Sequence, residues 1–268
     1  MNIDTELLCG LLAESAHTEL MPRFKHIDSH TKTDGSLVTE ADIAMQQSIK
    51  AQLNRHYPQI PLLGEEMSSE QQAAILENGK QGFWCLDPLD GTSNYVAGMP
   101  CFAVSLAYMI NGQAQIGIVF DPVRDELFHA VKGGGAWLNH QPLKLSCSTS
   151  QLNRSIAMVD FKRLALPLAT RLATDPPYLS QRSIGSVALD WCWLAAGRLQ
   201  LYLHGGAKLW DYAAGALIFE QAGGFFRLTK PHASQSDHPI PSLDPQMAMG
   251  ATNRVLFDAW NLWLDPNK

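Results

Sequence analysis

The chain has 268 residues, of which 46% are hydrophobic, and a formal net charge of −6. This length and apolar content allow a large core, either in one large domain or in two lobes. The negative charge and the lack of a Lys/Arg run argue against nucleic acid or an anionic membrane as a partner. Such partners are usually bound by a basic surface.

The cysteines and the N-terminal segment indicate the compartment. Five cysteines are scattered along the chain without C-x-x-C spacing, which is typical of a reducing compartment rather than of disulfides or a zinc site. The first Lys or Arg is Arg23, so no charged region precedes an apolar one as in a signal peptide. No apolar run approaches the roughly 20 residues of a membrane span. The sequence therefore predicts a soluble, cytoplasmic protein.

Two helices are predicted in the first 55 residues. Leucines recur at helical spacing over residues 4–20. Thr39 and Asp42 form a capping-box pattern, with Asp in the place of Glu, that predicts a helix to about residue 55. A carboxylate in the first turn of a helix is favourable without any catalysis. At this point Asp42 is therefore either a helix cap or a functional residue.

A short apolar run over 58–63 is followed by Gly64, Glu65 and Glu66. The run predicts a strand. Paired acids after a glycine at a strand end are usually a solvated loop, and the alternative is that they serve a site at the sheet edge. A helix is expected next, over 71–78.

The stretch over residues 84–95 begins as an apolar strand and ends in turn and cap chemistry. Pro88 biases Asp87 toward extended backbone. The carboxylates of Asp87 and Asp90 can therefore converge at one sheet edge, with the Leu89 carbonyl between them. Hard divalent cations bind such a set of oxygens.

Gly91 and Thr92 follow directly and are expected to begin a helix. The free N–H groups of a helix start can hold an anion. Metal ligands beside an anion site indicate phosphoryl chemistry. The alternative is that Asp-Pro-x-Asp-Gly is an ordinary surface turn, because Asp, Pro and Gly dominate turns for backbone reasons.

An antiparallel sheet is predicted after this stretch. Strands over 102–110 and 114–120 flank Asn111-Gly112, a strong hairpin signal. Strands over 127–131 and 136–138 suggest a second hairpin across three glycines.

The second half of the chain alternates strands and helices. Strands are predicted over 155–159 and 199–203, helices over 164–173, 186–196 and 210–224, and a polar loop over 230–245. Asp211 is the expected N-cap of the last helix and needs no further role to explain it.

Four acidic positions of the chain, taken together, resemble the inositol monophosphatase family, a branch of the magnesium-dependent, lithium-sensitive sugar phosphatases. The resemblance covers nearly the whole chain. One Asp-Pro-x-Asp-Gly would be weak support, but four motifs in the family's order and spacing are specific. These motifs are Val38-Thr39-x-x-Asp42, Gly64-Glu65-Glu66, Trp84-x-x-Asp87-Pro88-Leu89-Asp90-Gly91-Thr92-x-Asn94-Tyr95 and Trp210-Asp211-x-Ala213-Ala214-Gly215…Ala222-Gly223-Gly224.

The resemblance implies an α/β (α+β) layered sandwich in which helix pairs alternate with β-sheets. It implies a single domain over 1–268, with approximate lobes 1–145 (N-terminal helices and a large antiparallel sheet) and 146–268 (a smaller α/β lobe). It also implies assembly as a homodimer.

The resemblance further implies a site for two to three Mg²⁺ ions. One ion is expected on Glu65, Asp87 and the Leu89 carbonyl, and a second on Asp87, Asp90 and Asp211. A weaker third ion is expected to depend on Glu65, which is therefore counted with the catalytic residues.

Three further residues are expected to act directly on the phosphate and the attacking water. By resemblance, Asp42 and Thr92 position the water, and the N–H groups of Gly91 and Thr92 hold the phosphate. The implied reaction is hydrolysis of a small phosphate ester, first of all inositol monophosphate, by water activated at the metal site.

The alcohol part of the substrate is expected to contact Asp90, Gly185, Ser186, Val187, His204 and Asp211. His204 stands where inositol phosphatases usually carry a Glu that accepts hydrogen bonds from ring hydroxyls. Neutral His offers one acceptor and protonated His offers none. Histidinol phosphate, fructose 1,6-bisphosphate and 3′-phosphoadenosine 5′-phosphate therefore stay open as substrates. A regulatory interaction protein that kept the fold is the alternative from a different functional class.

Overall fold

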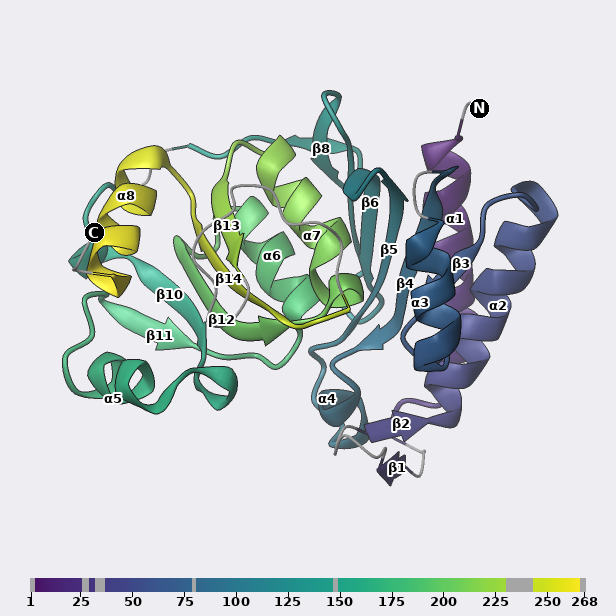
Figure 1. Cartoon of the computed structure of the whole chain (residues 1–268), viewed down its shortest axis with the longest axis horizontal. Helices are drawn as coiled ribbons and strands as arrows, with labels where there is room; N and C mark the ends of the chain where they lie inside the picture. Colours follow the sequence, from purple (N-terminus) through teal and green to yellow (C-terminus); the bar gives the residue numbers. More distant parts are fainter. Residues whose placement is uncertain are drawn as a thin grey trace.

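The computed structural model describes residues 3–25, 29–31, 37–78, 81–146, 149–229 and 243–265. Helix pairs and sheets alternate in five layers (Figure 1). One pair packs on the outer face of a seven-stranded sheet, and a second lies between this sheet and a five-stranded sheet. A third pair covers the far side of the smaller sheet. The layered α/β architecture expected from the sequence is thus confirmed.

The large sheet has the strand order β3-β4-β5-β6-β7-β8-β9. β3 and β4 run parallel, and the other neighbours run antiparallel. Both predicted hairpins form, and Asn111 and Gly112 take the positive φ that a tight two-residue turn requires. The strands are β3 (Leu62–Gly64), β4 (Phe83–Asp90), β5 (Ala103–Ile110), β6 (Gln113–Asp121), β7 (Glu126–Val131), β8 (Gly135–Leu138) and β9 (Gln141–Leu143).

The first helices pack on the outer face of this sheet. Apolar side chains four residues apart, such as Leu8 and Leu12, or Met45 and Ile49, are buried there against Trp84. A two-stranded sheet precedes α2, and a short helix follows β4. These elements are α1 (Thr5–Ser15) with a π-helical turn (Ala16–Leu20), β1 (Ser29–Thr31), β2 (Leu37–Thr39), α2 (Glu40–His56), α3 (Ser69–Glu77) and α4 (Thr92–Val96).

The smaller sheet has the order β11-β10-β12-β14-β13, in which β10 runs parallel to both of its neighbours. α6 and α7 lie on its inner face, while α5 and α8 lie on its outer face. The elements are β10 (Ile156–Asp160), α5 (Leu166–Thr174), β11 (Ser180–Arg182), α6 (Val187–Ala195), β12 (Leu201–Ala207), α7 (Leu209–Gln221), β13 (Phe225–Thr229), β14 (Gln246–Ala251) and α8 (Arg254–Leu264).

α7 is apolar on nearly all sides because it is packed between two sheets. Its backbone approaches β6 closely: a Cβ on Gly117 would lie 2.6 Å from the Ala214 carbonyl oxygen. α6 approaches from the other side, where a Cβ on Gly215 would lie 2.6 Å from Trp191 Cβ. These glycines let the middle layer come close enough to place its helix starts beside β4.

Some predicted elements differ from the structure. The strand predicted over 58–63 is reduced to β3, because Ile60 N–H bonds back to the Tyr57 carbonyl in a turn. Asp211 is the third residue of α7 rather than its N-cap, because the helix already begins at Leu209. α8 was not predicted, although Asn253 gives it a regular cap by accepting from the Leu256 N–H.

Two other expectations concern the C-terminal loop and the membrane. Most of the polar loop predicted over 230–245 lies outside the described residues. Where the structure describes the chain, no helix combines the length and the hydropathy needed to cross a membrane.

The close contact at Gly117 gives a test of the layer packing. We expect Gly117→Ala to lower the free energy of unfolding by about 1–3 kcal/mol, because the added methyl group meets α7 backbone. Gly10→Ala is the matched control, since Gly10 is an exposed position of α1 where a Cβ would meet nothing within 4 Å. It should raise stability by up to about 1 kcal/mol. Urea denaturation measures both changes, and a loss of equal size in the two variants would contradict the packing argument.

Candidate metal centre

Asp87 and Asp90 lie at the end of β4, where a bulge sets the direction of their side chains. Asp87 pairs with Ser105 and Asp90 with Ala103, so three residue steps on β4 match two on β5. In a regular strand, side chains three residues apart point to opposite faces. The extra residue of the bulge returns both carboxylates to one face. Pro88 is tolerated inside the bulge although it has no N–H to donate to the ladder.

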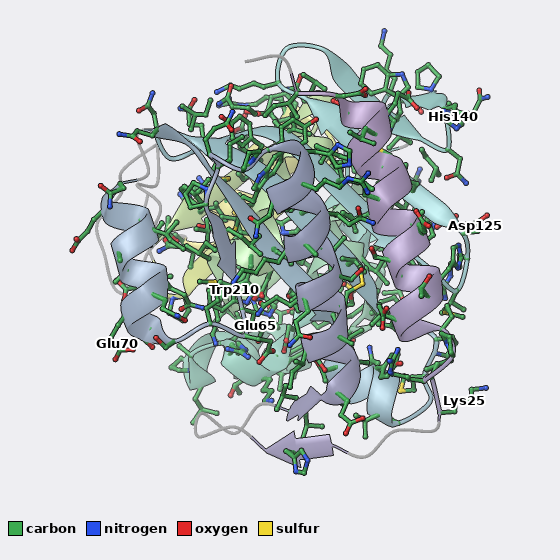
Figure 2. All side chains as sticks on the ribbon, turned by 90° about the vertical axis from the view of Figure 1, so that its right-hand side faces the viewer. Lys25, Glu65, Glu70, Asp125, His140 and Trp210 are labelled. Carbon is green, nitrogen blue, oxygen red and sulfur yellow. The ribbon has the colours of Figure 1, made fainter. Side chains whose placement is uncertain are left out.

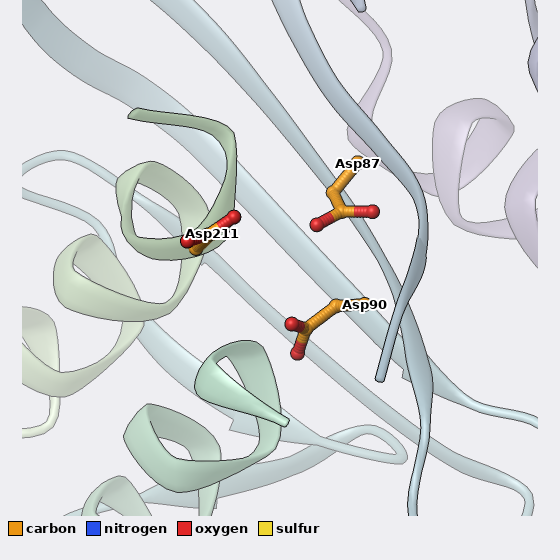
Figure 3. A group of neighbouring side chains, drawn as sticks. All are labelled: Asp87, Asp90 and Asp211. Carbon is orange, nitrogen blue, oxygen red and sulfur yellow. The ribbon is translucent and has the colours of Figure 1, made fainter. Parts of the chain in front are cut away.

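Asp211 reaches the same place from the first turn of α7. Carboxylate oxygens of Asp87, Asp90 and Asp211 lie within 4.8 Å of one another (Figure 3). The Ser105 hydroxyl of β5 donates to the Trp210 carbonyl at 3.1 Å and so holds the start of α7 against the large sheet. The predicted convergence of these three aspartates is confirmed in the structure.

Burial is the largest cause of the raised pKa values of the three carboxyl groups in this cluster. It raises the pKa of Asp90 to about 6, although the Ser186 hydroxyl and the Ala188 N–H both donate to that carboxylate. It raises the pKa of Asp211 to about 7, with repulsion from Asp90 and Glu65 adding to the effect. The pKa of Asp87 is raised well above its usual range by burial and by the charges of Glu65, Asp90 and Asp211.

These carboxylates therefore repel one another in an environment that disfavours their charge. Buried charges in proteins are usually paired or coordinate a metal, so a bound cation would compensate the charge of this cluster. The donors are all hard oxygens, and this chemistry suits Mg²⁺ better than a metal that prefers thiolates. The residues present fit a divalent cation of the kind expected from the sequence.

Glu65 follows β3 directly, and β3 runs parallel to β4, so both strands end at the same sheet edge. Its N–H donates to the Leu86 carbonyl at 3.2 Å. Its carboxylate is close enough to raise the pKa of Asp42 as well as those of the three clustered aspartates. In Figure 2 it lies between the lower ends of α2 and α3. The structure thus brings Glu65 to the edge of the candidate centre.

Asp42 belongs to the N-terminal cap of α2 and also contacts Thr92, which lies next to the centre. Its Oδ2 accepts from the Thr39 N–H at 2.7 Å and from the Thr39 hydroxyl at 2.6 Å, and so the predicted capping box is confirmed. Its Oδ1 lies 3.1 Å from the Thr92 hydroxyl, which is also 3.0 Å from the Leu89 carbonyl. Because a hydroxyl has one hydrogen, it donates to only one of the two at a time, and its lone pairs stay available to a third group.

Gly91 forms the turn between β4 and α4. It has φ +94°, and a Cβ there would lie 2.9 Å from the Cys101 carbonyl oxygen, so glycine is required on both grounds. Asn94 then donates to the carbonyls of Cys101 and Ile184 at 2.7 and 2.6 Å. This amide ties the start of α4 to the segment that leads into α6.

The expected substrate segment Gly185-Ser186-Val187 lies directly against the centre. Ser186 caps α6, and its hydroxyl donates to Asp90 Oδ2. The Ala188 N–H donates to the same oxygen at 2.7 Å. Asp90 therefore accepts hydrogen bonds from the start of α6, which favours a negative charge at this end of the helix.

His204 is buried on β12, the strand that leads directly into α7 and Asp211. It contacts Asp160, at 3.2 Å between Nε2 and Oδ2. Asp160 was not among the predicted site residues. The signal that could have found it is an acid at the end of the strand predicted over 155–159, beside the strand that carries His204.

The raised pKa values give a test of the cluster in the metal-free protein. Asp90 and Asp211 bind protons more tightly when folded than when unfolded, so their contribution to stability decreases as pH rises from about 4 to about 7. We expect the Tm without metal to be higher at pH 5.5 than at pH 8, by roughly 5 °C. Mg²⁺ should raise the Tm most at pH 8.

The matched control is Asp211→Asn, which removes one of these carboxylates. The pH dependence and the Mg²⁺ effect should both shrink in this variant. Thermal unfolding followed by circular dichroism measures both. The repulsion would be contradicted if the metal-free wild type had a lower Tm at pH 5.5 than at pH 8 and Asp211→Asn showed the same pH dependence.

Comparisons with known proteins agree with this geometry. Residues 5–256 match the model of the inositol monophosphatase family. Inositol monophosphatase 1 of Solanum lycopersicum is 38% identical over 80% of this chain and 78% of its own length. Nus factor SuhB of Haemophilus influenzae is 36% identical over 74% of each chain. The Thermotoga maritima IMPase structure superposes with a TM-score of 0.81 and 25% identity, over 98% of this chain and 96% of its own. The chain therefore belongs to the inositol monophosphatase family.

Proposed function

We propose that the protein is a Mg²⁺-dependent phosphomonoesterase that hydrolyses a small phosphate ester, with inositol monophosphate as the first candidate. The observation that carries this proposal is the cluster of three carboxylates, two buried and one half-buried, within 4.8 Å of one another. Membership of the family supports the same reaction class. A phosphate monoester is itself an anion, so an acidic site of this kind needs cations to admit it.

The proposed metal ligands are Glu65, Asp87, the Leu89 carbonyl, Asp90 and Asp211. Bound Mg²⁺ would neutralise charge on the phosphate and lower the pKa of the attacking water. The protein fixes the ligands rigidly: the bulge of β4 aims two of them, and the Ser105 hydroxyl secures the helix that carries a third. Preorganisation of this kind serves a reaction whose transition state needs neutralised charge more than covalent help.

The water would be positioned by Thr92 and Asp42. With its hydrogen donated to Asp42 Oδ1, the Thr92 hydroxyl can accept a hydrogen bond from water and direct that water's lone pair toward phosphorus. Burial raises the pKa of Asp42, which makes it a better proton acceptor. The N–H groups of Gly91 and Thr92 would hold a phosphate oxygen at the start of α4.

The identity of the alcohol is the finer part of the proposal. The Solanum relative is named for inositol monophosphate, which supports that substrate. Histidinol phosphate, fructose 1,6-bisphosphate and 3′-phosphoadenosine 5′-phosphate are the alternatives, because His204 stands where a Glu is usual. The Haemophilus relative is named as a Nus factor, and this favours a regulatory protein as the second candidate function.

We also propose a cytoplasmic homodimer. The dimer rests on family resemblance. The compartment is supported by Cys9, Cys85, Cys101 and Cys192, which are free thiols in the described part of the chain.

The proposed reaction is tested by a panel of phosphate esters, namely the four candidate substrates, assayed with and without Mg²⁺. We expect hydrolysis of at least one ester that requires Mg²⁺ and survives a zinc-selective chelator. By family resemblance, Li⁺ should inhibit this hydrolysis. Asp211→Asn should lower kcat/KM by roughly 100-fold or more. Full activity after removal of Mg²⁺ would contradict the metal assignment. No hydrolysis of any ester would favour the regulatory alternative.

A second test separates the two roles of Asp42. We expect Asp42→Asn to lower kcat by roughly 100-fold, while the lost cap interaction costs on the order of 1 kcal/mol of stability. Asp4→Asn is the matched control, since Asp4 caps α1 by accepting from the Leu7 N–H at 3.1 Å, far from the centre in the chain. The turnover of Asp4→Asn should equal that of the wild type. Near-normal turnover of Asp42→Asn, measured with saturating Mg²⁺, would leave Asp42 as a helix cap only.

A further inference from the structure

The inner face of the smaller sheet ends in a polar pair beside the metal centre. β10 and β12 run parallel, and Asp160 lies directly opposite His204 in their register. Side chains alternate along a strand. Tyr202 and Met158 pack in the core around α6 and α7, so His204 and Asp160, two residues further on, face the same layer.

The two ring nitrogens of His204 already have partners within the fold. Nδ1 accepts from the Gly206 N–H at 3.2 Å, and Nε2 lies 3.2 Å from Asp160 Oδ2. One tautomer satisfies both contacts: Nδ1 accepts, and the hydrogen on Nε2 is donated to Asp160. The ring is buried, with 4% of its side chain exposed. A substrate hydroxyl that bonded to this ring would have to displace one of these internal partners.

Asp160 is the exposed member of the pair. Its side chain is 26% exposed, and its two oxygens have different partners, Oδ2 the His204 ring and Oδ1 the Lys162 N–H at 2.8 Å. A carboxylate has about four acceptor positions, so it can still accept further hydrogen bonds. The His204 hydrogen bond is the largest cause that lowers the pKa of Asp160, and this keeps the carboxylate charged.

The backbone around the pair holds Asp160 in place. After Asp160, a 3₁₀ turn over Phe161–Arg163 packs against β12, and a Cβ on Gly205 would lie only 2.0 Å from the Arg163 carbonyl oxygen. Glycine is the residue that permits this approach. The His204 ring and the Lys162 N–H of this turn therefore hold one oxygen each of the Asp160 carboxylate.

The strands that carry the pair, β10 and β12, belong to the smaller sheet, which lies across α6 and α7 from β4 (Figure 1). β12, which carries His204, leads directly into α7 and Asp211. Burial, and after it the charges of Asp90 and Asp160, raise the pKa of Asp190 in α6. β4 and α4 provide Asp87, Gly91 and Thr92 on one side. A phosphate held there would direct its alcohol toward the second sheet, where β10 and β12 end.

We propose that Asp160, oriented by His204, is the carboxylate that accepts hydrogen bonds from hydroxyl groups of the substrate's alcohol. Asp160 is then a specificity-determining residue, and His204 is a positioning residue that acts through it. This inference rests on the proposed function for the placement of the phosphate.

The test compares two ligands with the same ring skeleton, inositol 1-phosphate and cyclohexyl phosphate, which differ in the ring hydroxyls. We expect the wild type to prefer inositol 1-phosphate in kcat/KM. Asp160→Asn should reduce that preference by roughly tenfold or more, since a site built for hydroxyls discriminates through its polar partners. Its hydrolysis of cyclohexyl phosphate should stay within about threefold of the wild type. Asp175→Asn, the same chemical change on an exposed residue beyond α5, is the matched control.

His204 is tested by its effect on the same preference. His204→Leu should reduce the preference for inositol 1-phosphate as much as Asp160→Asn does. The double variant should reduce this preference no further than either single variant. His204→Gln, which keeps an N–H donor toward Asp160, should recover part of it. A structural role alone would lower kcat/KM for both esters in parallel, in proportion to lost stability.

Binding separates this inference from the proposed reaction. Titration calorimetry with Ca²⁺ in place of Mg²⁺ measures the dissociation constants of the two esters without relying on turnover. Loss of preference for inositol 1-phosphate in Asp160→Asn supports the inference even if no ester is hydrolysed. Mg²⁺-dependent hydrolysis with a preference that Asp160→Asn leaves unchanged overturns the inference and leaves the proposed function intact. A wild type that binds both esters equally, or neither, also overturns it.

Discussion

The mutual repulsion of buried carboxylates is the constraint on which the rest of this structure depends. Asp87, Asp90 and Asp211 lie within 4.8 Å of one another, and the first two are buried while Asp211 is half-buried. Such an arrangement persists because a large core holds it and because local partners reduce its cost. Two N–H groups at helix starts, those of Ala188 and Lys208, donate to Asp90 and Asp211. The dipoles of α6 and α7 favour the same charges.

The layered fold explains why these groups meet at one place. β4 ends where α6 and α7 begin, and the small residues Gly117 and Gly215 allow the middle layer to approach both the sheet and its own neighbour. The carboxylates thus come from a strand and from a helix start that are far apart in sequence. Neither element alone holds a complete ligand set, and the interface between them is what assembles it.

The parts of the fold and of the site that depend on residues close together in the sequence could be predicted from the sequence. The Asn111-Gly112 hairpin and the Thr39–Asp42 capping box depend on residues within a few positions of one another, and both formed as predicted. The bulge in β4 was not predictable, because it is defined by the pairing with β5. The contact of His204 with Asp160 likewise depends on the register of two strands that are separated in the chain by two helices, α5 and α6, and a third strand, β11.

The placement of Asp87 and Asp90 on β4 and of Asp211 on α7 has a mechanical consequence. An ion bound to all three would join the first sheet to the middle helix layer as a non-covalent cross-link. Ion removal would then leave like charges facing each other across a mostly apolar interface, and that interface would loosen first. The amount of free magnesium in the surroundings would therefore set the rigidity of the molecule as well as its rate of reaction.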